Sequence, residues 1–259
     1  MTKEKRYLNI DEQIEHLKSK GLQIPSVKLA RQYLMDIGYY KLINGYKKSF
    51  MENKKYVDGT RIDDLYYLYF FDNDLKELLL RHLNRIEVAI KARMTDVISK
   101  KYGIREADYL KSENFKPDSL SNSNRVTFSE IRKDIIDTIK KQKVNQRSLM
   151  HYSKNYGYYP FWAVANVLSF GTITHLYSKM KQPDQNEIAK TFQVKSDFLE
   201  SVLIVALLFR NACAHNEVIY HFRTKYSIRQ QDQEIFKLFD LNTNDKKGNL
   251  QEAQTTCFA

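Results

Sequence analysis

Apolar residues recur every three or four positions along most of this chain, and that spacing predicts helices. No long stretch shows the strict alternation of apolar and polar residues that predicts a half-buried strand. The low numbers of Gly (8) and Pro (4) also favour long helices with few tight turns. The sequence therefore predicts an all-α protein. The clearest helical stretches are residues 10–20, 25–35, 63–102 and 128–144. The residues expected to face the core are Ile14 and Leu17 in the first, Leu29, Ala30 and Leu34 in the second, and Ile131, Ile135, Ile136 and Ile139 in the last.

The longest pattern, residues 63–102, predicts two helices with a break near Asp72-Asn73-Asp74. One apolar stripe in it is expected to face the core. The stripe consists of Leu75, Leu78, Leu79, Leu83, Ile86, Ile90, Met94 and Val97. Glu87 lies on this stripe, so its carboxylate is expected to be buried and to need a cation. Arg210 is one candidate partner, and a neighbour on the same helix, Arg85 or Lys91, is the other.

Two local signals predict further helix boundaries. Pro160 suits the first turn of a helix that Gly171 then closes. Asp184-x-x-Glu187 resembles a capping box, which predicts a helix beginning near residue 184.

The length of 259 residues fits one large domain with extensions. The first two helices resemble a helix-turn-helix in outline, so duplex DNA binding by residues 10–46 is an alternative to a helical pair packed on the main domain. Residues 103–124 are expected to form a loop that is most irregular at 121–124. After residue 226 the apolar content falls. We expect an N-terminal helical extension at 1–58, a helical domain at 59–226, and a short helix with a flexible tail at 227–259.

Charge is unevenly placed along the chain. Lys and Arg number 42 against 31 acidic residues, a net charge of +11, and no acidic residue occurs between Asp137 and Asp184. Basic and aromatic residues alternate in that window, a composition typical of surfaces that follow a nucleic acid backbone and stack on its bases. The alternative is a basic protein with no polyanionic partner. The candidate RNA-binding residues are Lys140, Lys141, Lys143, Arg147, Lys154, Tyr156, Tyr158 and Tyr159.

Several classes of protein are disfavoured. The two cysteines, Cys213 and Cys257, indicate no disulfide framework, and no His or Cys spacing typical of a metal site is present. We therefore expect neither a metal nor a cofactor. The longest apolar run falls short of the roughly 20 residues that span a bilayer, and the N-terminus lacks the pattern of a signal peptide. A cytoplasmic protein without a membrane partner is expected.

The most distinctive stretch follows residues 202–209, which are apolar on every side and so predict a buried helix. Arg210, Asn211 and His215 come directly after this run. Arg binds phosphate with a planar charged fork, and His transfers protons near neutral pH. Asn211 shares a helix face with His215 and can orient it or donate to a phosphate oxygen. These groups predict a site that cleaves RNA without a metal.

Structural alternatives exist for each of these residues. Arg210 can cap the buried helix, and His215 can bond a backbone carbonyl. Cys213 lies between them and is either a small buried thiol or a nucleophile beside His215.

Four stretches occur in an order that resembles the Abi family of bacterial abortive-infection proteins of the AbiD/AbiF type. They are Gly38-Tyr39-Tyr40-Lys41-Leu42-Ile43-Asn44-Gly45-Tyr46, Pro160-Phe161-Trp162, Ser169-Phe170-Gly171-Thr172 and Arg210-Asn211-Ala212-Cys213-Ala214-His215. The last resembles the R-x(4–6)-H motif of HEPN domains. The resemblance covers roughly residues 5–225.

This resemblance implies a HEPN-like helical bundle core with an N-terminal helical extension. It implies an endoribonuclease toxin of phage defence, with Arg210 and His215 as catalytic residues. HEPN domains pair two motifs, and this chain has no second motif after a buried helix, so a homodimer is expected. Some members are inhibited by a protein or a small noncoding RNA. One subgroup is silenced at a Tyr two residues after the motif His, where this chain has Glu217. A noncatalytic RNA-binding protein is the alternative.

Overall fold

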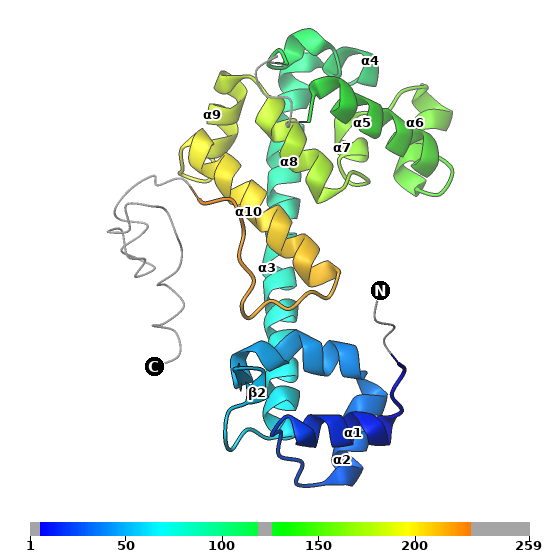
Figure 1. The fold of residues 1–259 in the computed structure, drawn as a ribbon. Helices are drawn as coiled ribbons and strands as arrows, with labels where there is room; N and C mark the ends of the chain where they lie inside the picture. The colour runs from blue at the N-terminus through cyan, green and yellow to red at the C-terminus, as the bar shows by residue number, and fades with distance from the viewer. Residues whose placement is uncertain (1–5, 119–125, 229–259) are drawn as a thin grey trace, which may run out of the picture. The chain divides into compact units, whose positions relative to one another are not determined.

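A computed structural model describes residues 6–118 and 126–228 (Figure 1). The described chain gathers into two compact units. Unit 1 contains residues 6–80 and 212–222, and unit 2 contains residues 81–118, 126–211 and 223–228. The irregular loop at 121–124 and the short helix and tail expected after residue 228 lie outside the described residues. The domain limits 1–58, 59–226 and 227–259 remain a prediction.

Unit 1 begins with the two short helices that the sequence predicts. Helix α1 (Ile10–Ser19) starts at a capping box formed by Asn9 and Glu12. Helix α2 (Val27–Asp36) starts at the N-cap residue Ser26, whose hydroxyl accepts a hydrogen bond from the backbone N–H of Leu29. They pack against each other, with Ile14, Leu17, Ala30 and Leu34 buried. The expectation that Leu29 faces the core is wrong, because its side chain is 44% exposed. The outer face of α2 also exposes Lys28, Met35 and Asp36.

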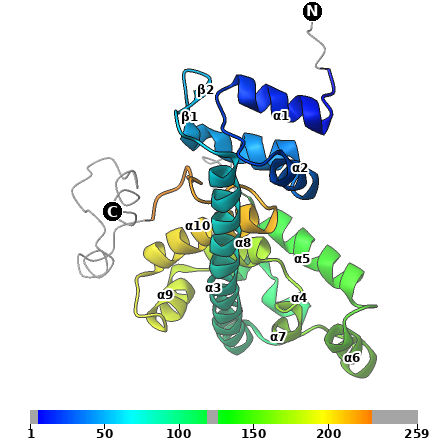
Figure 2. The ribbon, with the colours of Figure 1, turned by 90° about the horizontal axis from the view of Figure 1, so that it is seen from below.

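A compact connection follows α2. It contains the π-helical turn η1 (Tyr40–Asn44), the 3-10 turn η2 (Lys47–Phe50) and a two-stranded antiparallel hairpin, β1 (Met51–Glu52) with β2 (Lys55–Tyr56). Leu42, Ile43 and Tyr46 are buried in this connection, whereas Tyr40 is 82% exposed. The stretch around η1 is thus mainly a packed aromatic turn. The hairpin of β1 and β2 that follows it can be seen in Figure 2.

The long helical pattern forms one continuous helix, α3 (Ile62–Tyr102), so the predicted break at Asp72-Asn73-Asp74 is wrong. These residues do not end the helix because Asp72 accepts its hydrogen bonds from other parts of the fold. Most of the predicted stripe is buried or partly buried, with Ile90 and Met94 fully so. Leu78 is the exception, at 46% exposed.

Unit 2 contains the remaining helices. Within the expected loop at 103–124 lie two short helical turns, α4 (Glu106–Tyr109) and η3 (Ser112–Asn114). Helix α5 (Phe128–Gln142) follows, with a capping box of Thr127 and Glu130. It packs against α8 (Phe170–Lys179), and its inner residues Ile131, Ile135 and Ile139 are buried.

Two predicted boundaries in unit 2 are wrong. The helix that begins after Pro160 is only α7 (Phe161–Val164), and Gly171 lies in the first turn of α8, whose cap is Ser169. Helix α9 (Gln182–Lys190) begins before Asp184, which is buried in its first turn instead of capping it. Helices α6 (Arg147–Tyr156) and α10 (Ser196–Ala214) complete the unit, α10 running on into unit 1.

The all-α class is confirmed, because helices dominate the described residues and the hairpin is the only sheet among them. Among residues 6–118 and 126–228, no helix combines the length and hydropathy needed to cross a bilayer.

Candidate functional site

Helix α10 positions the predicted catalytic residues at its C-terminal end. None of residues 202–209 is exposed, and Leu203, Val205 and Ala206 are buried, as expected of a core helix. Arg210 and Asn211 are half-buried, and the Nη1 of Arg210 lies 3.4 Å from the Oδ1 of Asn211. The guanidinium makes no ion pair with any described residue.

The end of α10 turns the chain so that His215 is exposed. Asn216 has a left-handed backbone, with φ of 58°. Its N–H donates to the carbonyl of Cys213 (3.1 Å), and the N–H of Glu217 donates to the carbonyl of Ala212 (2.9 Å). This pair of bonds is the Schellman motif, which satisfies the last carbonyls of a helix. His215 is the residue between the helix and the left-handed turn.

The predicted catalytic residues divide between the two units. Arg210 and Asn211 belong to unit 2, and His215 belongs to unit 1. Cys213, also in unit 1, is buried, and burial raises the pKa of its thiol. A raised pKa disfavours the thiolate that a nucleophilic cysteine needs. The structure thus favours the interpretation of Cys213 as a packed small residue.

Glu87 pairs with its helix neighbour. Its Oε1 lies 2.7 Å from the Nζ of Lys91, four residues along α3. Lys91 also donates to the carbonyl of Leu168 (2.8 Å). Of the two partners considered for Glu87, the neighbour on its own helix is the one observed, and the described residues show no ion pair between Glu87 and Arg210.

Sequence reasoning missed a buried polar cluster in unit 1, centred on Asp72. The carboxylate of Asp72 accepts hydrogen bonds from the hydroxyl of Tyr46 (2.8 Å), from Lys76 Nζ (2.8 Å), and from the backbone N–H groups of Ile219 (2.9 Å) and Tyr220 (2.6 Å). Burial, and then the bond to Asp72, raise the pKa of the Tyr46 hydroxyl, so it remains a donor. The available signal was the i, i+4 spacing of Asp72 and Lys76 inside an apolar stretch.

The stretch Gly38–Tyr46 packs on the residues that follow the motif. The ring of Tyr46 stacks on that of Tyr220, with centroids 5.9 Å apart. The hydroxyls of Ser49 and Tyr220 are 2.7 Å apart. A Cβ on Gly45 would lie 3.3 Å from the side chain of Val218, which explains why the smallest residue stands there. Within unit 1, the first motif stretch therefore packs on residues 218–220, which follow the Arg210–His215 motif.

The two other motif stretches belong to the core of unit 2. Phe161 and Phe170 are fully buried. A Cβ on Gly171 would lie 3.8 Å from Leu207 of α10, so a small residue allows α8 to pack closely on that helix. The Ser169–Thr172 stretch therefore packs on α10.

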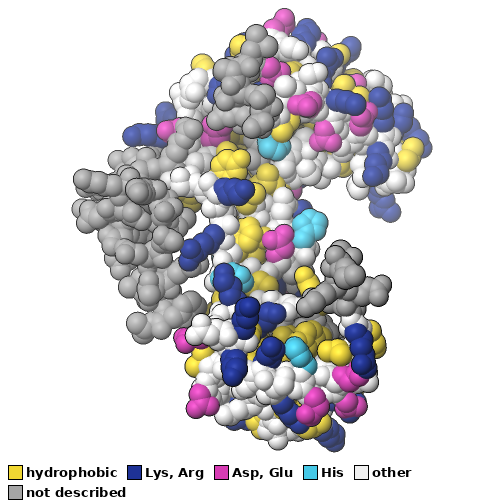
Figure 3. Space-filling view, in the orientation of Figure 1, with side chains coloured by type: hydrophobic (Ala, Val, Ile, Leu, Met, Phe, Trp, Pro, Cys, Tyr) yellow, Lys and Arg dark blue, Asp and Glu magenta, His cyan; other side chains and the backbone are white. Residues whose placement is uncertain are grey.

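The predicted RNA-binding cations lie close together on the surface of unit 2. Lys140 and Lys141 are in the last turn of α5, Lys143 follows it, and Arg147 and Lys154 are in α6. All five are exposed. Figure 3 shows Lys and Arg side chains gathered over α5 and α6. We call this region, residues 140–162, the basic–aromatic surface.

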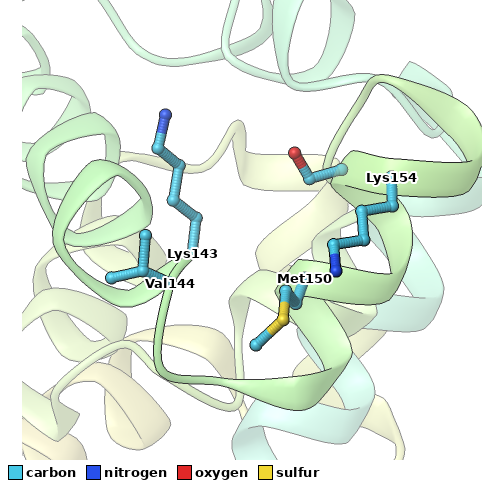
Figure 4. Close-up of a pocket in the computed structure, with 5 residues that line it drawn as sticks. Lys143, Val144, Met150 and Lys154 are labelled. Atoms are coloured by element: carbon cyan, nitrogen blue, oxygen red, sulfur yellow. The ribbon is translucent and has the colours of Figure 1, made fainter.

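A pocket of about 310 Å³ opens on this surface between α5 and α6. Lys143 and Val144 line one side, and Met150 and Lys154 line the other (Figure 4). Two predicted RNA-binding lysines therefore line one hollow, together with the apolar side chains of Val144 and Met150.

The predicted tyrosines divide into two kinds. Tyr156 is exposed, whereas Tyr158 and Tyr159 are half-buried and engaged within the fold. Arg105 stands over the ring of Tyr158 at 5.4 Å, and the hydroxyl of Tyr159 donates to Ser153 (3.1 Å). Tyr158 and Tyr159 therefore pack beneath the surface, and Tyr156 is the predicted tyrosine whose ring is open to a ligand.

Additional rings extend the surface beyond the predicted set. Tyr152 lies 5.5 Å from Tyr156 and 6.1 Å from Trp162, between ring centroids. The indole N–H of Trp162 donates to the hydroxyl of Tyr152 (2.8 Å), and Trp162 is 38% exposed. His151 completes the row, 5.4 Å from Tyr152. Helical spacing of residues 152 and 156 was the signal that these rings share one face.

A second pocket, of about 420 Å³, lies between α5 and α8 and is lined in part by Glu130, Asp134 and His175. Asp134 accepts a hydrogen bond from the hydroxyl of Thr172 (2.6 Å), and burial lowers the pKa of His175. In the described ranges no group of three or more His, Cys, Asp or Glu side chains is arranged to hold a metal ion.

Comparison with known proteins identifies the family. No curated protein and no solved structure matches the chain. Residues 32–221 match the family model described as Abi-like protein, a stretch that begins within α2 and includes the Asp72 cluster, the basic–aromatic surface and the Arg210–His215 motif. The match covers well over half of the sequence, and the chain therefore belongs to the Abi-like protein family.

Proposed function

We propose that this protein is a metal-independent endoribonuclease of bacterial abortive infection, a form of phage defence, with Arg210, His215 and Asn211 as its catalytic residues. Membership of the Abi-like family supports the setting. The single observation that carries the proposed chemistry is the exposed His215, in a defined turn at the end of helix α10. Arg210 lies in the last turns of that helix and forms no ion pair among the described residues.

The proposed reaction uses the nucleophile that RNA itself supplies. A general base removes the proton of a 2′-hydroxyl, and the 2′-oxygen bonds to the adjacent phosphorus. The bond from phosphorus to the 5′-oxygen breaks, and a general acid protonates that leaving oxygen. His215 acts in proton transfer, and Arg210 stabilises the added negative charge on the phosphate. The products are a 2′,3′-cyclic phosphate and a 5′-hydroxyl.

The same reasoning favours a homodimer. The reaction needs one base and one acid, and a single imidazole cannot hold both protonation states at once. Two copies related by a two-fold axis would place two His215 and two Arg210 side chains at one composite site.

The basic–aromatic surface supports RNA as the substrate and also as a possible inhibitory partner, such as a small noncoding RNA. Exposed cations follow a phosphate backbone, and Tyr156 and Trp162 offer faces on which unpaired bases stack. Binding through these cations is expected to weaken steeply with salt.

The test is incubation of purified protein with end-labelled RNA in excess EDTA, after removal of any co-purified RNA. The parent protein is expected to cleave and to leave 2′,3′-cyclic ends. Arg210→Ala and His215→Ala are each expected to lower cleavage at least a hundredfold, since each removes a group that acts in the transition state.

His16→Ala is the matched control, because His16 is also exposed but lies on α1, outside the family match. It is expected to cleave like the parent. Thermal unfolding of all variants separates loss of chemistry from loss of fold. The nuclease proposal fails if RNA-free parent protein, shown to be dimeric, leaves every RNA intact, or if His215→Ala cleaves as well as His16→Ala.

A second candidate function is noncatalytic RNA binding. One observation favours it: the basic–aromatic surface and its pocket lie within unit 2 and do not involve His215. If this function holds, the double change Lys143→Gln/Lys154→Gln would weaken RNA binding. It would also lower the slope of log binding constant against log salt concentration by about 1.4, near 0.7 for each lost phosphate contact. The control Lys28→Gln/Lys190→Gln removes the same charge from α2 and α9. This function is favoured if all proteins, including His215→Ala, bind RNA and none cleaves it.

A further inference from the structure

Two buried charges in unit 1 hold the chain on both sides of a single turn. Asp72 is fully buried in α3 and binds the backbone N–H groups of Ile219 and Tyr220 through its Oδ1. Its Oδ2 accepts from Lys76 Nζ. Lys76 is 4% exposed, and its ammonium group reaches onward to the Oδ1 of Asn216 at 3.1 Å. One ion pair of α3 therefore contacts the turn residue 216 and the returning chain at 219–220.

The held segment is the one that carries His215. Asn216 follows His215 directly and adopts the left-handed conformation that ends α10. Asn is among the few residues besides Gly that adopt this conformation readily, and here its amide oxygen also receives the Lys76 proton. A Gly would satisfy the backbone but could not bind Lys76. The residue at 216 thus serves the turn and the ion pair together.

The apolar contacts fix the same segment from the other side. Ala212, Cys213 and Ile219 form one small buried cluster, with Leu75, Leu79 and Leu80 of α3 packed against it. The segment therefore packs against α3 up to Cys213, exposes His215 to solvent, and packs against α3 again at Ile219. Within the described residues of unit 1, no hydrogen bond reaches the imidazole of His215, so the backbone turn, through the Cα–Cβ bond, is what places this side chain.

We propose that Asp72, Lys76 and Asn216 are positioning residues for His215, which fix the place of its side chain by holding the backbone turn that carries it. This inference rests on the proposed ribonuclease function for its effect on activity, although the clamp itself does not. Displacement of a reacting group by about 1 Å costs on the order of a hundredfold in rate. Asp72 and Lys76 are both buried, so a lost contact of this pair is not readily replaced by water, and the pair resists such displacement better than exposed groups would.

The test compares three substitutions. Asn216→Gly keeps the left-handed turn and removes the acceptor of Lys76. Asn216→Asp restores an acceptor, now charged, and tolerates the same backbone. Lys101→Met breaks a different Lys–Asp pair, with Asp184 in unit 2, and shows how much activity is lost to destabilisation alone.

We expect Asn216→Gly to lower kcat for RNA cleavage about tenfold while KM changes less than twofold. Asn216→Asp is expected to recover most of that loss, and Lys101→Met is expected to retain the parent kcat. Asn216 is exposed, so its substitution is not expected to prevent folding. The clamp is overturned if the kcat of Asn216→Gly falls no further than that of Lys101→Met.

A second readout separates this inference from the proposed function. The ring carbon–proton NMR signal of His215, assigned by its absence in His215→Ala, reports its surroundings without any RNA. Asn216→Gly is expected to shift or broaden this signal, and Asn216→Asp is expected to leave it near its parent position. A shift in protein that cleaves no RNA would support the clamp while the nuclease proposal fails. An unshifted signal in Asn216→Gly would overturn the clamp even in an active nuclease.

Discussion

Each unit of this protein contains a buried aspartate bound by a lysine and a tyrosine, and the two sites differ in what else they bind. In unit 1, Asp72 accepts from Lys76 (2.8 Å) and from the hydroxyl of Tyr46 (2.8 Å). In unit 2, Asp184 accepts from Lys101 (2.7 Å) and from the hydroxyl of Tyr102 (2.5 Å). The two carboxylates thus share the same kinds of side-chain partner.

The difference lies in burial and in the main chain. The side chain of Lys76 is 6% exposed and that of Lys101 is 36% exposed, where it also binds Glu187. Only Asp72 binds backbone N–H groups, those of Ile219 and Tyr220. The Asp184 site joins the first turn of α9 to the end of α3, so both of its sides are regular helices whose backbone is already fixed by their own hydrogen bonds. The Asp72 site shapes a segment without regular structure, and that segment is the one that follows His215.

The largest expected difference concerns the lysines. Lys76→Met leaves Asp72 buried and charged without its cation, and is expected to lower the free energy of unfolding by about 3–5 kcal/mol. Lys101→Met is expected to lower it by only about 1 kcal/mol, because a partly exposed pair is screened by water. Urea unfolding at pH 7 measures both. Equal losses of unfolding free energy in the two variants would show that the greater burial of the Asp72 site does not make its ion pair more important to stability.

The tyrosines are expected to give a smaller difference at neutral pH. Tyr46→Phe removes a buried hydrogen bond to a carboxylate and is expected to cost about 2 kcal/mol. Tyr102→Phe is expected to cost about 1 kcal/mol, since its site is more open. The same urea titrations at pH 7 decide this, and a larger loss for Tyr102→Phe would contradict the order.

Alkaline pH should reverse these tyrosine effects. Burial and then the bond to Asp72 raise the pKa of Tyr46, and burial and then Asp184 raise the pKa of Tyr102 to about 12. A folded-state pKa above the unfolded value near 10 gives stability that is present below pH 10 and lost as the pH rises above it. Between pH 10 and 11.5 the parent is expected to lose about 1.4 kcal/mol more per pH unit than either Phe variant. Parallel pH curves for parent and variants would disprove this linkage.

The smallest expected effect concerns two matching helix ends. Gln193 after α9 and Asn216 after α10 both have φ of 58°, and both turns have the same pair of backbone bonds. Gln193→Gly is expected to stabilise the protein by about 1 kcal/mol, because Gly adopts this conformation without strain. Asn216→Gly is expected to give no gain, since it loses the bond to Lys76. A gain of equal size at both positions, measured by thermal unfolding, would argue against a role for that bond.

The sequence alone predicted much of this architecture. The spacing of Ile14 with Leu17, and of Ile131 with Ile135, identified faces that are buried in the structure. The apolar run at 202–209 identified the core helix that leads to Arg210. Such patterns succeed because the periodicity of a helix is a local property of the chain. Positions at the margins of a face, such as Leu29 and Leu78, were misassigned because the width of the covered face depends on the packing partner.

Both central aspartates were misinterpreted for a related reason. Asp72 was taken as part of a helix break and Asp184 as a cap, since Asp in an exposed helix does favour such positions. In the fold each is buried inside a helix and bound by partners up to 148 residues away.

Thus the sequence by itself determined the helical class, the buried helix α10, the Arg210–His215 spacing and the cationic composition of residues 140–162. Only the tertiary structure decided that Glu87 pairs with Lys91, that Lys143 and Lys154 share a pocket, and that Asp72 holds the turn after His215. The physical reason is that apolar burial follows from local periodicity, whereas the partner of a polar group is set by which distant atoms the fold brings within about 3 Å.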